Sequence, residues 1–139
     1  MKEDFITYEL AVKLKEKGFN DECHAYYEPL KHCLNLSRVF KTNSLAENYN
    51  CITAPTIYQV LKWLREKKKI FVAINIGYCY ESDEIPFPTN HKMEPILRGY
   101  YYGIWELDNL NDKNTCSEYF EDYEQAALAG IEYVIDNLI

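Results

Sequence analysis

The chain has 139 residues, of which 47% are apolar and 27% charged, and its formal net charge is −7. This length and composition are typical of one domain with one hydrophobic core, residues 1–139, and they exclude an intrinsically disordered chain. The thirteen tyrosines, against six Phe and two Trp, favour a sheet with half-exposed faces, because Tyr suits strands and combines an apolar ring with a polar tip.

The N-terminal segment "MKEDFITYEL" has no long apolar run after its lysine, so we expect no secretory signal. No stretch approaches about 18 consecutive apolar residues, so we expect no membrane span. These features predict a cytoplasmic protein that does not bind membranes. The five cysteines are odd in number and irregularly spaced, and in a reducing compartment they are expected to be free thiols.

The N-terminal third of the chain predicts a helix followed by a hairpin. The helix "TYELAVKLKEKGF" has Thr7 as a candidate N-cap and Gly18 as a stop signal. Strands are expected at 22–28 and 34–40 from their aromatic and β-branched residues. The polar segment 41–50 is expected to be a loop.

A second helix is expected in "TAPTIYQVLKWLREKKK". Thr53 or Thr56 can cap it, and the apolar positions 57, 60, 61 and 64 follow helical spacing. The basic run Lys67-Lys68-Lys69 suits the negative end of the helix dipole.

Three strands and a last helix follow. The strands are expected at 70–80, 96–107 and 115–120. Asp122 can cap the last helix, with Gln125 in capping-box position. Its apolar stripe consists of Ala127, Ile131, Val134 and Leu138.

The predicted class is therefore α+β, with the element order α-β-β-α-β-β-β-α. Strands joined by short turns favour an antiparallel sheet, and we expect the helices to pack mainly on one face of it. From residue 53 onward the element order equals that of double-stranded-RNA-binding domains, which is an analogy of topology alone.

The sequence contains one compact cluster of Cys and His residues and none of the common catalytic motifs. Cys23-His24 and His32-Cys33 form a compact Cys/His cluster, but neighbouring strand residues point to opposite faces, so we expect no metal site. No nucleophile-elbow, zinc-protease, P-loop or dinucleotide-binding motif occurs, which argues against an enzyme and predicts no cofactor and no catalytic residue. A small enzyme using Cys and His stays as an alternative.

The candidate partner-binding residues are aromatic. Alternation along a strand places Tyr78 with Tyr80, and Tyr100 with Tyr102, so the four phenols form a ladder if the two faces coincide. The other interpretation is a sheet packed under helices. The long segment 81–95 has three prolines and contains Phe87, and it is either a binding loop or a variable hairpin tip.

Three segments carry a resemblance: "ITYELAVKLKEKGF", "APTIYQVLKWLREK" and "FEDYEQAALAGIEYVIDNL". They resemble short proteins encoded on prophages and mobile elements of anaerobic gut bacteria. The resemblance spans nearly the whole chain and lies in structural motifs. It implies neither an activity nor functional residues.

The charge distribution separates the remaining hypotheses. Residues 104–139 contain nine acidic residues and a single basic one, Lys113, whereas the rest of the chain is nearly neutral. An acidic chain is a poor ligand for nucleic acid. We therefore expect a non-catalytic module that binds another protein and is a monomer or a weak homodimer. A nucleic-acid-binding protein and an acidic DNA mimic are the alternatives.

Overall fold

The computed structural model describes residues 4–79, 96–108 and 115–139. Its helices are α1 (Tyr8–Glu16), α2 (Asn43–Ala46), the 3₁₀ helix η2 (Glu47–Tyr49), α3 (Ile57–Lys67) and α4 (Tyr123–Asn137). Its strands are β1 (Cys23–Tyr27), β2 (Leu34–Lys41), β3 (Ile52–Thr53), β4 (Ile70–Cys79), β5 (Ile96–Glu106) and β6 (Thr115–Cys116). The predicted α+β class is confirmed.

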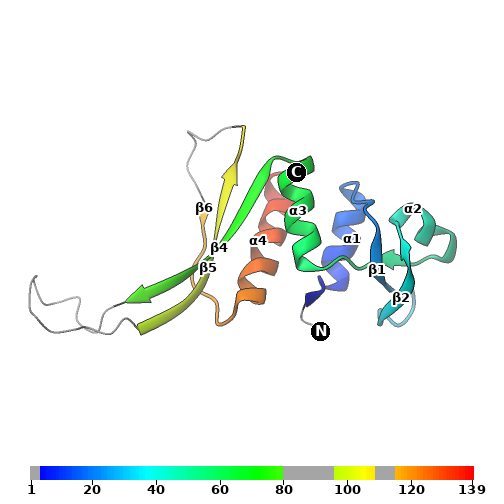
Figure 1. Ribbon diagram of the computed structural model, residues 1–139, viewed down its shortest axis with the longest axis horizontal. Coiled ribbons are helices and arrows are strands. Elements are labelled where there is room, and N and C mark those ends of the chain that lie inside the picture. The colour runs from blue at the N-terminus through cyan, green and yellow to red at the C-terminus, as the bar shows by residue number, and fades with distance from the viewer. Residues whose placement is uncertain (1–3, 80–95, 109–114) are drawn as a thin grey trace, which may run out of the picture.

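The described strands form two antiparallel sheets, where the sequence had suggested one. The sheet β2-β1-β3 contains the predicted early hairpin, and the sheet β4-β5-β6 contains the later strands. Helices α4, α3 and α1 lie between the two sheets, which gives the molecule its elongated shape (Figure 1). The helix layer divides the strands into two sheets, because each sheet packs against a different side of the helices.

The predicted caps position the three long helices. The side chains of Thr7 and Asp122 accept hydrogen bonds from Leu10 N and Gln125 N, respectively. Of the two candidate caps for α3, Thr56 is the actual one, and it forms a full capping box with Gln59. Thr53 is instead a buried residue of β3.

One cluster of buried side chains connects all these layers. It joins Ala25 of β1, Leu14 of α1, Leu64 of α3, Ile131 of α4 and Val72 of β4. Of the predicted α4 stripe, Ala127, Ile131 and Val134 are fully buried, and Leu138 is partly buried against the cluster. Gly130 permits the close approach of α4 to the sheet, because a Cβ there would crowd Val72 Cγ1 and Tyr102.

Segment 41–50 was predicted to be a loop, and this prediction was wrong. Thr42 caps a short helix, and the side chain of buried Asn43 bonds to both Phe19 O and Thr53 N, at 2.7 and 3.0 Å. These bonds satisfy a buried amide and tie the segment to the core. They depend on residues 24 positions before and 10 positions after Asn43, which local propensity does not report.

Candidate functional site

The β4–β5 hairpin has two different faces. The register pairs Val72 with Ile104, Ile74 with Tyr102 and Ile76 with Tyr100 on one face, and directly paired residues of antiparallel strands share a face. Helix α4 covers this face of the hairpin, since a Cβ at Gly130 would touch Val72 and Tyr102. We refer to it as the helix face. The opposite, open face contains the intervening pairs.

The open face is rich in exposed aromatic rings. Phe71 pairs with Trp105 across the strands, and their side chains are 39% and 40% exposed. Tyr101 lies on the same face four residues before Trp105 and is half-buried. Its ring meets that of Tyr119 edge-on, with centroids 5.9 Å apart. We refer to Phe71, Tyr101, Trp105 and Tyr119 as the aromatic face.

Small residues form the floor between these rings. Ala73 pairs with Gly103, and Gly77 pairs with Gly99. The position that a Cβ of Gly103 would take lies 3.7 Å from Trp105 Nε1 and 3.8 Å from Asn75 Nδ2. Two side-chain donors therefore converge over bare backbone, a geometry that suits a carbonyl or carboxylate oxygen of a ligand.

A bulge after β6 places Tyr119 on the open face. Ser117 Oγ accepts a hydrogen bond from Tyr102 N at 2.9 Å, so a side chain replaces a backbone carbonyl in the ladder. Pairing resumes at Phe120, whose N and O both bond to Tyr100. The extra residue reverses the alternation, so Phe120 stacks with Tyr102 while Tyr119 covers Gly77. This bulge also explains why the predicted strand 115–120 is regular only at 115–116.

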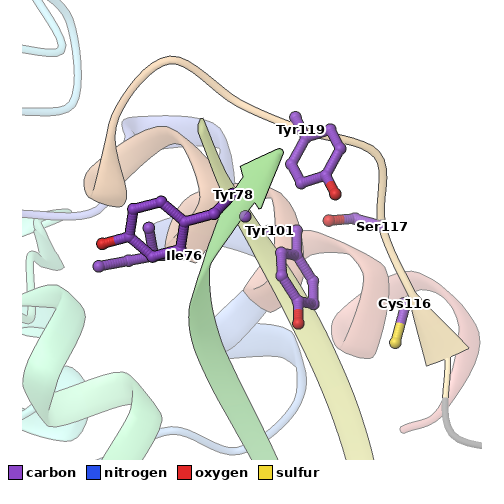
Figure 2. Close-up of a pocket in the computed structure, with 7 residues that line it drawn as sticks. Ile76, Tyr78, Tyr101, Cys116, Ser117 and Tyr119 are labelled. Atoms are coloured by element: carbon purple, nitrogen blue, oxygen red, sulfur yellow. The ribbon is translucent and has the colours of Figure 1, made fainter. Parts of the chain in front are cut away.

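An open pocket of about 400 Å³ lies where Tyr119 crosses the hairpin. Figure 2 shows Tyr101, Cys116, Ser117 and Tyr119 on one side of β4, with Ile76 and Tyr78 pointing away on the other. The volume lies in the range of ligand sites, roughly 300–1,000 Å³, but such sites enclose most of their ligand. An open hollow among aromatic rings suits a side chain that protrudes from a partner surface.

Several of the acidic residues of the C-terminal part are already used within the fold. Lys13 of α1 lies 3.3 Å from Glu132 and 2.9 Å from Asp136, and these hydrogen bonds raise the pKa of the lysine. Asp122 caps α4. Of the described charged residues from β5 to the cap of α4, all but Arg98 are acidic, namely Glu106, Asp108, Glu118, Glu121 and Asp122.

The structure separates the tyrosines that the sequence grouped. Tyr100 and Tyr102 do share a face, but their cross-strand partners are Ile76 and Ile74. Tyr102 packs against Phe120 and Tyr133, and burial raises its pKa. A register shift pairs Tyr78 with Leu97, so no tyrosine ladder forms among the described residues. Tyr80, Phe87 and the 81–95 segment lie outside the described residues.

The Cys/His cluster is spread over different environments. Cys23 is buried in β1 and His24 is exposed beside it. His32 stacks on Tyr8 with ring centroids 3.7 Å apart, and Cys33 is exposed. In the described part of the chain, no group of three or more Cys, His, Asp or Glu side chains is placed to hold a metal.

The thiols also differ in their exposure to solvent. Cys23, Cys33, Cys51 and Cys116 are free. Burial raises the pKa of Cys23 to about 11, which disfavours its nucleophilic thiolate form. Cys116 is exposed on the open face opposite Gly103.

Sequence reasoning missed all four residues of the aromatic face, Phe71, Tyr101, Trp105 and Tyr119, as site residues. Alternation along a strand places residues 71 and 105 on the other face of the sheet from the β-branched residues 72, 74 and 104. The β-branched residues favour the buried face. That signal could have identified Phe71 and Trp105. Tyr119 could not be found this way, because the bulge at Ser117 reverses its side.

Comparison of the chain with protein-family models, with curated proteins and with solved structures gave no match. In the described residues, no helix combines the length and the apolar character needed to cross a membrane.

Proposed function

We propose that this protein is a non-catalytic, cytoplasmic protein-interaction module, and that its aromatic face binds a partner protein. The observation that carries the proposal is the exposure of Phe71, Trp105 and Tyr119, beside the half-buried Tyr101, on the sheet face that the described helices leave uncovered. Trp and Tyr are enriched in the binding hot spots of protein interfaces, because they bury a large apolar area and keep a polar group for hydrogen bonding.

The charges around the face define the partner chemistry. The acidic residues Glu106, Asp108, Glu118 and Glu121 adjoin it in the chain. Cations are attracted both to carboxylates and to the faces of aromatic rings. A protein surface that presents Arg or Lys among apolar side chains fits best. The resemblance to prophage and mobile-element proteins supports a cytosolic partner of the bacterial host or the phage.

Nucleic acid fits less well as the ligand. Within the basic run that follows α3, Lys68 Nζ lies 5.1 Å from the centroid of the Trp63 ring, so one of the three cations already has an intramolecular partner. The N-terminus of α4, a feature that commonly binds phosphate, follows Glu118 and Glu121 and has Glu124 in its first turn. These carboxylates repel a phosphate backbone.

The test compares captured partners across variants. Wild-type protein, Trp105→Ala and Leu36→Ala are immobilised, and proteins retained from a native host lysate are quantified. Leu36 is 61% exposed on the other sheet and serves as the matched control. A partner is expected that Trp105→Ala loses and Leu36→Ala keeps. Truncation of a hot-spot residue costs about 2 kcal/mol or more, which is roughly thirtyfold in Kd.

The captured partner is then purified and titrated. Its affinity is expected to fall as salt rises, because the proposed contact joins opposite charges. Identical retention by wild type and Trp105→Ala, for every captured protein, contradicts the proposal.

A further inference from the structure

A second hollow lies on the sheet that does not contain the aromatic face. Its strands pair Ala25 with Leu36 and Tyr27 with Leu34, and directly paired residues of antiparallel strands share a face. This face is turned towards α1 (Figure 1), because the ring of Tyr27 meets that of Tyr8 edge-on with centroids 5.6 Å apart. Ala25 and Tyr27 are buried, whereas Leu36 is 61% exposed. The helices therefore cover the central strand β1 and leave part of the edge strand β2 uncovered.

The hollow has a volume of about 640 Å³, and small-molecule sites measure roughly 300–1,000 Å³. It is larger and more enclosed than the pocket beside Tyr119. Phe5, Tyr27, Leu34 and Leu36 form its apolar part, and the consecutive residues 31–33 line the rest. We refer to it as the β2 hollow. In the part of the chain that the structure describes, its lining contains no acidic residue.

The polar side chains that a ligand can reach lie at one end of the β2 hollow. Lys31 and His32 belong to the loop between β1 and β2, and the apolar residues of β2 extend away from that loop. The hydroxyl of Tyr27 already donates a hydrogen bond to Ile6 O at 2.5 Å. The thiol of Cys33 donates to Lys31 O at 3.6 Å. The hollow thus has two nitrogen donors at one end and apolar surface over the rest.

Lys31 and His32 are donors that the fold does not use. The ammonium of Lys31 is exposed and has neither an ion pair nor a hydrogen bond to another described residue. The ring of His32 stacks on that of Tyr8, with centroids 3.7 Å apart and an angle of 12° between the planes. Stacking orients the ring and leaves its nitrogen atoms accessible at the edge. Residues 29–46 hold three basic residues and no acidic one, although the chain carries a net charge of −7.

We propose that the β2 hollow binds a small amphipathic carboxylic acid, a molecule with one carboxylate and an aliphatic body, such as a medium-chain fatty acid. The carboxylate accepts hydrogen bonds from Lys31 and His32, and the ammonium adds the attraction of opposite charges. The aliphatic body lies over Leu34 and Leu36. It removes from water an apolar surface that the free protein exposes.

The distribution of polar groups favours such an acid over a peptide segment of a partner. A peptide carries a backbone donor and acceptor at nearly every residue, and burying them without partners costs free energy. The side chains of Phe5, Leu34 and Leu36 offer no hydrogen bond to these groups. A fatty acid has its polar group at one end only, as the hollow has. A second copy of the chain is disfavoured, because two molecules with a net charge of −7 repel each other.

The first test titrates the purified full chain with octanoate by isothermal titration calorimetry. Octanol has the same chain without the charge, and octylammonium has the opposite charge. Octanoate is expected to bind most tightly. Octylammonium is expected to bind at least about tenfold more weakly, because a hydrogen bond to a charged group is replaced by repulsion from Lys31.

The second test locates the binding site with variants. Lys31→Glu reverses the charge at the rim, and Leu36→Asp places a carboxylate beneath the aliphatic body. Both positions are exposed, so the fold should persist, which circular dichroism checks. Each variant is expected to bind octanoate at least about tenfold more weakly. Lys62→Glu reverses an exposed lysine on α3, and Trp105→Ala removes a ring of the aromatic face, and both controls are expected to bind octanoate like the wild type.

Octanoate that does not bind at millimolar concentration overturns the proposal. So does equal affinity for octanoate and octylammonium, or an affinity for octanoate that Lys31→Glu leaves unchanged. A synthetic peptide of alternating leucine and glutamate that displaces octanoate and binds more tightly would assign the hollow to a partner segment instead. A dimer in light scattering that Lys31→Glu dissociates would assign it to a second copy. None of these outcomes bears on the aromatic face, which belongs to the other sheet.

Discussion

The ring of Tyr119 lies over Gly77, and it occupies the space that a side chain at position 77 would need. Because Gly77 has no side chain, the ring of Tyr119, 42 positions later in the chain, can close one end of the aromatic face. The bulge at Ser117 and the glycine act together, since the first turns Tyr119 to the open face and the second makes room for its ring.

Gly77→Ala is therefore expected to destabilise the fold by about 1–3 kcal/mol, as overpacking does. The measurement is urea unfolding. In a Tyr119→Ala background the same substitution should cost little, because the competing ring is gone. Gly103→Ala is the matched control on the same face, where the new Cβ would meet neighbours at 3.7 and 3.8 Å, which is ordinary contact. Equal costs at positions 77 and 103 would contradict the placement of Tyr119.

Ile131→Asp is expected to unfold the protein. Ile131 is fully buried in α4, and an unpaired buried carboxylate costs several kcal/mol. Circular dichroism and thermal melting report the loss. Gln125→Asp introduces the same acid at an exposed position in the first turn of the same helix, and it should change stability by no more than about 0.5 kcal/mol. A folded Ile131→Asp protein with an unchanged Tm would show that α4 packs differently.

Alkaline pH is expected to destabilise the protein through Cys23. Its pKa is raised from 9.0 in the unfolded chain to about 11 by burial, with a smaller opposing contribution from Thr53. The folded state therefore holds the proton more tightly. The resulting stability is complete below pH 9 and is lost as pH rises through 11, by about 3 kcal/mol at most.

The urea midpoint of the wild type should accordingly fall between pH 9 and 11. Cys23→Ala should show a shallower fall over the same interval. Some decline should persist in the variant, because burial also raises the pKa of Tyr27 and of Tyr102. Parallel pH profiles of wild type and variant would show that Cys23 ionises as easily in the folded as in the unfolded chain.

Direct binding of nucleic acid is expected to be absent. Residues 104–139 have nine acidic residues and one basic residue, and Lys68 already contacts Trp63. Gel shifts with single- and double-stranded DNA and RNA at moderate salt provide the test. Submicromolar binding that disappears when Lys67, Lys68 and Lys69 are replaced by Ser would favour the nucleic-acid alternative over the protein partner.

The amino-acid sequence by itself determined the local elements. Thr7, Thr56 and Asp122 cap helices where the sequence places them, because a cap needs only the amides of the next turn. Alternation likewise put Tyr100 and Tyr102 on one face, because that depends on strand geometry alone. The apolar residues 127, 131 and 134 recur at helical spacing, which places them on one face of α4, and they are buried.

Only the tertiary structure decided which surfaces are free. The division into two sheets depends on the helix layer between them, and the open face exists because α4 approaches the hairpin from the side of Val72 and Tyr102. The place of Tyr119 depends on a bond between Ser117 Oγ and Tyr102 N, fifteen residues apart in the chain. Each of these contacts joins residues distant in sequence, and local propensity and periodicity report only on neighbours along the chain.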